Sequence, residues 1–150
     1  MIEQRPRTFT VLTNNECTVL VSGRDSGGAY CVLEFGVPPG GGGNSLHTDP
    51  FLETFYVLDG ELEFTLEREG KQETFRPAVG ESVYIDHGVR HKFTCVGDKP
   101  ARALAIALPG FEEYMWELAV AWPHKHWDPV ATPAAMAPVA KKFDVIFVNQ

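Results

Sequence analysis

The chain has 150 residues, with 13 Lys and Arg against 20 Asp and Glu, which leaves a net charge of −7. This length favours a single domain over residues 1–150, and 44% apolar residues are enough to build a buried core. The acidic balance argues against nucleic acid or an anionic membrane surface as the partner, because both favour a basic face. No apolar run reaches the roughly 20 residues that a membrane-spanning helix needs. Residues 1–7 also lack the apolar core of a signal peptide. The chain has three cysteines, an odd number, and their spacing is not that of a metal site (Cys17, Cys31 and Cys95). We therefore expect reduced thiols in a soluble, cytoplasmic protein.

Short β-like segments, separated by turns rich in Gly, Pro and Asp, fill the chain up to residue 108. In residues 61–66, for example, Leu62, Phe64 and Leu66 alternate with polar neighbours, as in a strand with one buried face. Many such segments predict an all-β barrel or sandwich of antiparallel strands, with its core over about residues 7–108. The candidate strands are 7–12, 18–22, 29–37, 46–49, 52–58, 61–68, 72–76, 82–85, 91–96 and 102–108, and the composition of 38–44 predicts a loop.

The pattern changes after residue 109, in a tail that we expect over residues 109–150. Apolar residues then recur at helical spacing from Phe111 to Trp122, which predicts one amphipathic helix ended by Pro123. The segment 129–140 suits a second short helix, which Pro138 is expected to interrupt. Residues 144–148 are typical of a last strand, which we expect to cover an exposed sheet edge.

Two segments carry the candidate metal-binding and catalytic residues. His47 and Asp49 are two positions apart, so on a strand they share a face. Glu53 has the parity of the apolar Phe55, which predicts a carboxylate inside the barrel, where a charge is costly unless a cation compensates it. His91 lies in a second segment. Two imidazoles and one or two carboxylates that meet inside a barrel indicate a first-row transition-metal site.

These residues resemble the two motifs of the cupin superfamily. Gly41, His47, Glu53 and Gly60 have the spacing of the first motif, and Gly80, Gly88 and His91 that of the second. The likeness covers roughly residues 29–108 and implies an all-β double-stranded β-helix (jelly-roll barrel) with a C-terminal helical appendage. The tail is similar to that of small single-domain cupins of the quercetin-dioxygenase-like kind.

The resemblance also implies one divalent transition metal ion (Fe, Mn, Zn or Ni), a homodimer, and His47, Glu53 and His91 as ligands. The chain departs from the motifs at three positions: Asp49 replaces a ligand histidine, and Asp86 and Cys95 replace the usual Pro and Asn. Asp49 leaves three alternatives open. As a ligand, it would make the site formally neutral with a divalent ion and favour harder metals such as Fe(II), Mn(II) or Zn(II). It could instead hold a bound water, leaving a triad of two histidines and one carboxylate. Alternatively no metal binds, and Asp49 pairs with His47.

We therefore expect an enzyme that acts on a small phenolic, enol or polyketide-like substrate, first of all a dioxygenase-type oxidoreductase. Glu53 would take the substrate proton. Phe55 and Phe93 would line the substrate pocket, or simply form barrel core, and Arg90 would meet an anionic substrate at the rim. Two alternatives remain: a metal-dependent isomerase or polyketide cyclase that uses no oxygen, and a non-catalytic cupin that binds a small ligand. One scaffold supports many chemistries, so the fold alone does not separate them.

Overall fold

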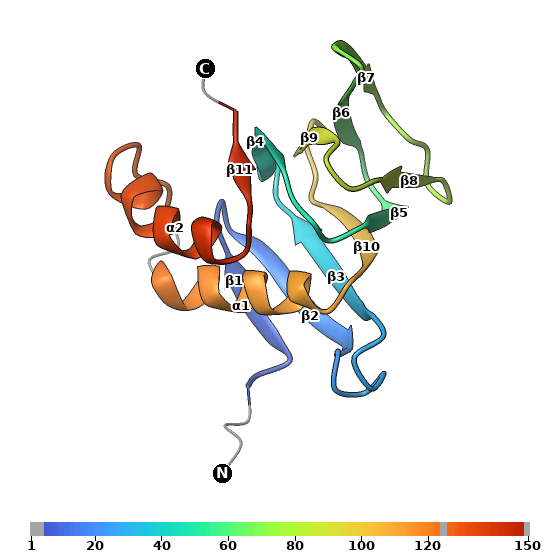
Figure 1. Ribbon diagram of the computed structural model, residues 1–150. Helices are drawn as coiled ribbons and strands as arrows, with labels where there is room; N and C mark the ends of the chain where they lie inside the picture. Colours follow the sequence, from blue (N-terminus) through green and yellow to red (C-terminus); the bar gives the residue numbers. More distant parts are fainter. Residues whose placement is uncertain (1–4, 124–125, 149–150) are drawn as a thin grey trace.

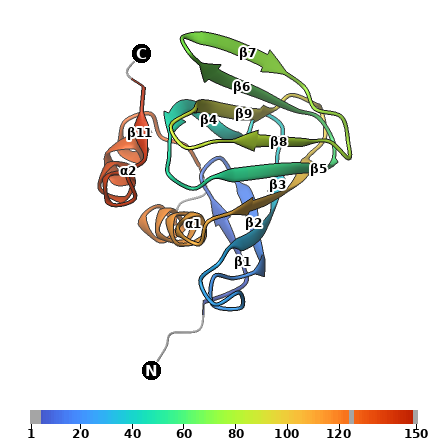
Figure 2. The same cartoon turned by 45° about the vertical axis from the view of Figure 1, so that its right-hand side comes forward.

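Two antiparallel sheets face each other and form the barrel (Figures 1 and 2). The computed structural model describes residues 5–123 and 126–148, without the side chain of Asn44. The first sheet has the order β1 (Thr8–Val11), β2 (Asn15–Val21), β3 (Cys31–Val37), β10 (Ala101–Ala107), β5 (Glu53–Asp59) and β8 (Ser82–Ile85). The second has the order β11 (Ile146–Phe147), β4 (Gly42–Thr48), β9 (Arg90–Cys95), β6 (Leu62–Arg68) and β7 (Lys71–Phe75). The predicted all-β fold is confirmed.

The core lies between the sheets, because alternate residues of each strand point inward. Every second residue of β3 and β10 is buried. Phe55 and Phe64 fill the middle of the barrel, with ring centroids 5.5 Å apart. Most of the barrel interior is therefore packed with apolar side chains.

The C-terminal segment covers one side of the barrel with two helices, α1 (Gly110–Ala121) and α2 (Ala131–Lys142), and then returns to the sheet as β11 (Figure 1). The apolar face of α1 is buried, and Phe111 packs on Phe35 of β3 and on Phe51. Lys142 of α2 binds Glu117 of α1 at 2.8 Å. The expected pairing of the last strand with a sheet edge is confirmed, since β11 pairs with β4.

Two local expectations were wrong. Residues 38–44 are not all loop, because β4 begins at Gly42 and pairs with β9. A Cβ added at Gly43 would lie 3.2 Å from the Phe93 ring, so the glycine here allows two strands to approach closely rather than forming a turn. Pro138 does not interrupt α2, which continues to Lys142 and tolerates the one backbone hydrogen bond that a proline removes.

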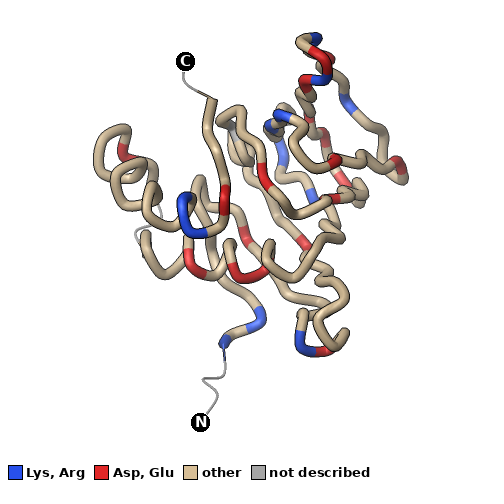
Figure 3. The backbone as a smooth tube through the Cα atoms, in the orientation of Figure 1, with Lys and Arg blue, Asp and Glu red and all other residues tan. Residues whose placement is uncertain are grey.

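Charged residues are dispersed over the described chain, and several are paired (Figure 3). Arg102 binds Glu34 at 3.1 Å and Arg76 binds Glu63 at 3.0 Å across neighbouring segments. The three cysteines are free and buried. No helix among the described residues is long and apolar enough to cross a membrane. The homodimer and the cytoplasmic location stay predictions.

Candidate metal centre

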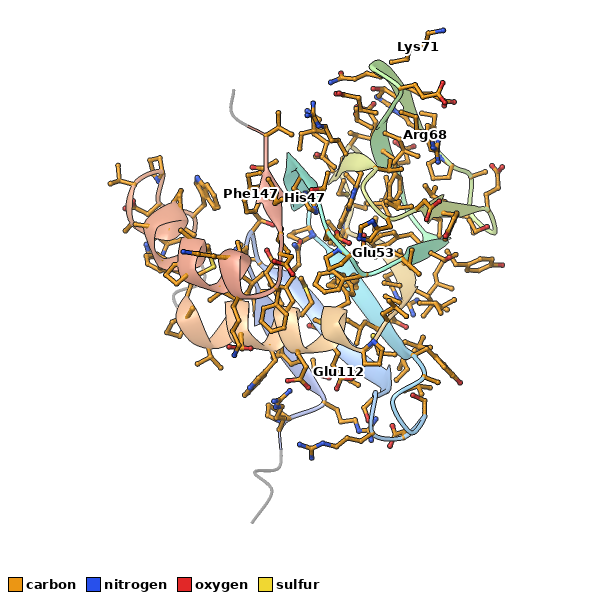
Figure 4. The ribbon with its side chains drawn as sticks, in the orientation of Figure 1. His47, Glu53, Arg68, Lys71, Glu112 and Phe147 are labelled. Carbon is orange, nitrogen blue, oxygen red and sulfur yellow. The ribbon has the colours of Figure 1, made fainter. Side chains whose placement is uncertain are left out.

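Three strands bring the predicted ligands to one end of the barrel. His47 lies near the end of β4, Asp49 follows that strand, Glu53 begins β5 and His91 is in β9. The register of β4 on β9 sets His47 directly opposite His91, and the centroids of their rings are 4.3 Å apart. His47 and Glu53 are both labelled in Figure 4.

Each imidazole is oriented by its own backbone. His47 Nδ1 lies 2.7 Å from the carbonyl oxygen of Ser45, and His91 Nδ1 lies 2.9 Å from that of Val89. A carbonyl oxygen only accepts hydrogen bonds, so Nδ1 must carry the proton in both rings. A neutral imidazole then has its lone pair on Nε2, which is the atom that faces the other site residues.

Asp49 divides its two oxygens between the backbone and the site. Its Oδ1 accepts a hydrogen bond from the N–H of Phe51 at 3.0 Å, in a turn of the Asx type. Its Oδ2 lies 3.6 Å from His47 Nε2 and 3.2 Å from His91 Nε2. Burial opposes ionisation of Asp49, but contacts with both histidines and the Phe51 N–H outweigh it and hold the pKa of this carboxyl well below its ordinary value. Asp49 is therefore a carboxylate at neutral pH.

Glu53 is the most deeply buried acid of the site, with 2% of its surface exposed. Its Oε2 lies 3.0 Å from His91 Nε2 but has no hydrogen-bond partner among the described residues. Burial raises the pKa of the Glu53 carboxyl above its ordinary value, and the charge of Asp49 acts in the same direction, against the attraction of His91. For His91, burial opposes protonation, but contacts with Asp49 and Glu53 outweigh it and raise the pKa of the imidazole to about 10.

The spacing of these atoms suits a metal ion. Ligand atoms of His47, Asp49 and His91 all lie within 4.8 Å of one another. For metal–ligand bonds of about 2.1 Å, neighbouring ligands are about 3.4 Å apart in a tetrahedron and about 3.0 Å apart in an octahedron. The distances from Asp49 Oδ2 to the two imidazoles fall close to these values. The unpartnered Glu53 oxygen is a further donor beside them. The residues therefore fit a divalent ion.

The three residues predicted to contact the substrate do not all lie at the ligand cluster. Phe93 packs against Phe55, with ring centroids 5.3 Å apart, and both belong to the aromatic cluster inside the barrel. Phe55 is 2% exposed, so it lies in the core rather than on an open pocket wall. Arg90 precedes His91 in β9 and points to the other face of the sheet, where it binds Glu67 at 3.0 Å. The structure does not bring Arg90 to the ligand cluster. A groove of about 320 Å³ lies elsewhere, on the outer side of β2, β3 and β10.

Sequence reasoning missed Phe147, which comes to the site from β11. It lies opposite His47 in the β11–β4 pair, and the centroids of the two rings are 5.7 Å apart. The only signal for it was the expectation that the last strand covers a sheet edge. The pattern of that strand does not say which edge it covers.

The comparisons agree with this architecture. The Cupin domain family matches residues 33–107, half of the chain. The chain belongs to the cupin superfamily. Among proteins of curated function, none matches the sequence.

Several cupins of known structure share the fold with this one. The polyketide cyclase RemF from Streptomyces resistomycificus is 22% identical with a TM-score of 0.56, over 73% of this chain and 80% of the cyclase. Oxalate decarboxylase from Bacillus subtilis is 22% identical with a TM-score of 0.56, over 70% of this chain and 27% of the decarboxylase. An oxalate oxidase in complex with glycolate is 21% identical with a TM-score of 0.53, over 63% of this chain and 50% of the oxidase. At these identities the likeness establishes the fold alone.

Proposed function

We propose that this cupin is a metal-dependent enzyme that acts on a small phenolic, enol or polyketide-like substrate. In this proposal His47, Asp49 and His91 hold one divalent ion, with Glu53 beside it as a further ligand and as the proton acceptor. The observation that carries the proposal is the buried Glu53 Oε2, which has no hydrogen-bond partner among the described residues and lies 3.0 Å from His91 Nε2. A buried acid in such a position is costly unless a cation compensates its charge.

The donor set restricts the metal. Two carboxylates and two neutral imidazoles balance the charge of a divalent ion, and the oxygen donors favour Fe(II), Mn(II) or Zn(II) over softer ions, with Ni(II) as the remaining candidate. Asp49 supports the first of the three alternatives for its role, because its Oδ2 is directed at both imidazoles while its Oδ1 is held by the Phe51 N–H.

The residues of the site suit removal of a proton from the substrate. A divalent ion bound here would supply Lewis-acid charge, which lowers the pKa of a phenol or enol that binds next to it. Glu53 accepts the proton at its carboxylate, which lies within the ligand cluster, 3.0 Å from His91 Nε2. The substrate approaches from the side of His47, whose side chain is 15% exposed while those of His91 and Glu53 are 3% exposed.

Dioxygenase-type oxidation is our first proposal for the reaction that follows. Non-haem iron oxygenases use two histidines and one carboxylate with open positions, a set to which the proposed site adds a second carboxylate, and an oxalate oxidase is among the structural neighbours. Cyclisation or isomerisation without oxygen is the second, favoured by the likeness to a polyketide cyclase that this chain covers for 80% of its length. An oxygen electrode and product mass separate the two. Turnover without oxygen, with no oxygen atom gained, would reject the oxidation.

The metal itself is tested by elemental analysis of the purified protein. We expect about one transition-metal ion per chain in the wild type and loss of the ion in His91→Ala. His87→Ala is the matched control, because His87 is an exposed histidine in the turn before β9. A wild-type protein that takes up none of the four metals would overturn the proposal and leave the non-catalytic, ligand-binding role.

A further inference from the structure

The C-terminal strand brings an aromatic ring to the metal centre. Within the antiparallel β11–β4 pair, Phe147 lies directly opposite His47 and Ile146 opposite Thr48, and the Val148 N–H donates to the carbonyl oxygen of Leu46 at 3.0 Å. Directly opposite residues of an antiparallel pair share a face of the sheet. Phe147 is therefore on the same face as the His47 imidazole, and Figure 4 shows the two side chains next to each other.

Phe147 differs from the other aromatic residues near the site in its exposure. Phe55 and Phe64 are buried in the barrel and pack against each other and against Phe93. Phe147 is 47% exposed, although its ring contacts His47 at a centroid distance of 5.7 Å and an interplanar angle of 45°. It thus presents open apolar surface beside the part of the ligand cluster that solvent reaches.

Such a surface has a defined use at a metal centre. Aromatic rings attract other flat π-systems in offset or tilted arrangements. A planar ligand whose oxygen binds at the metal must extend away from it, and on the His47 side it then passes Phe147. A small aliphatic anion is too short to do so.

We propose that Phe147 is the wall of the substrate site and selects planar, conjugated substrates over small aliphatic acids. This inference rests on the proposed function, since it requires a metal ion at His47, Asp49 and His91. It adds a specificity-determining residue outside the cupin motifs and assigns a role to β11 in addition to covering the sheet edge.

The test is a binding titration on protein loaded with Co(II), whose visible absorption reports ligands that bind the ion. The probes are catechol, a planar diol, and acetate, a small aliphatic anion. For Phe147→Ala we expect a catechol dissociation constant roughly three- to tenfold higher than in the wild type. The acetate constant should not change. Phe147→Tyr should restore tight catechol binding, and Phe147→Leu should not.

Ile146→Ala is the matched control, because Ile146 is 65% exposed on the same strand but on the opposite face. It should leave both constants unchanged. Equal catechol affinity in Phe147→Ala and the wild type would overturn the role of the wall. So would an equal loss of affinity for both probes, or loss of Co(II) from the variant, because either result assigns Phe147 to positioning His47. If the wild type takes up no Co(II), the proposed function fails as well, so the two failures are distinguishable.

Discussion

Replacing Glu53 with glutamine should have opposite effects on the metal-free and the metal-bound protein. The variant keeps the shape of the side chain and removes its charge. In the metal-free protein the charged form of Glu53 is unfavourable on balance, because burial of the carboxylate, which is 2% exposed, and the charge of Asp49 outweigh the attraction of His91, whose Nε2 lies 3.0 Å from Oε2. A buried polar group that is only partly compensated costs about 1–3 kcal/mol. We therefore expect Glu53→Gln to be more stable than the wild type without metal.

The size of this gain can be measured by thermal unfolding in the presence of a chelator. For a chain of this length, about 1 kcal/mol corresponds to roughly 2–4 °C in Tm. The pH dependence supplies an internal check. The folded pKa of Glu53 is raised, so the cost of its charge sets in as the pH rises above the ordinary carboxyl value of about 4.3. The advantage of the variant should be present at pH 7 and shrink toward pH 4.

The metal-bound protein should respond in the other direction. Loss of a group that only supports a ligand typically lowers metal affinity about 10–100-fold, and loss of a charged donor should cost at least that much. Competition with a chelator measures this affinity. Glu67→Gln is the control, since Glu67 binds Arg90 on the outer face of the barrel and its removal should cost at most about 1 kcal/mol with no effect on the metal. A metal-free Glu53→Gln that is less stable than the wild type, or a variant with unchanged metal affinity, would refute the reasoning.

Three further predictions concern the site and its support. Without metal, the wild type should lose stability as the pH rises from the ordinary histidine value of 6.5 toward about 10, because folding raises the pKa of His91; urea unfolding should show a flatter profile in His91→Gln, and an unchanged slope would contradict this. Asp49→Asn should keep an acceptor for the Phe51 N–H and so keep the circular-dichroism spectrum, but lose bound metal by elemental analysis. Gly60→Ala should lower Tm far more than Gly70→Ala. Both glycines have a positive φ, +79° and +75°, which costs an alanine about 1–2 kcal/mol at either position. Only at Gly60 would the added Cβ also meet Ala101, at 2.7 Å from the Ala101 Cα. Similar Tm values for the two variants would argue against the close contact.

The placement of the ligands could be predicted from the sequence because it depends on parity and local spacing. Glu53 points inward through the period of two in a strand. Asp49 lies just beyond the end of β4, where its two-residue spacing from His47 still brings its carboxylate to both imidazoles. Their meeting with His91 followed from the resemblance to a known family, and the register of β4 on β9 agrees with it.

The remaining features depend on contacts between distant segments, which local patterns do not contain. The partner of Phe147 is set by the choice of β4 as the covered edge, about 100 residues earlier in the chain. The outward parity of Arg90 is visible in the sequence, but its ion pair with Glu67 depends on the register of β9 on β6. The strand at Gly42 and Gly43 was not predicted, because its composition is typical of loops. The Phe93 ring opposite Gly43 requires a residue without a side chain there, since a Cβ would lie 3.2 Å from the ring.

The hydrogen bonds from Nδ1 of His47 and His91 to carbonyl oxygens two residues earlier have a consequence for how such a barrel can diversify. In both rings the main chain fixes which nitrogen carries the proton. In the proposed enzyme, substitutions around the opening can therefore change which substrate enters without changing the protonation of the two candidate ligands. Such a protein can acquire new substrates through substitutions around the opening, while the two histidines keep their positions and their protonated Nδ1 atoms.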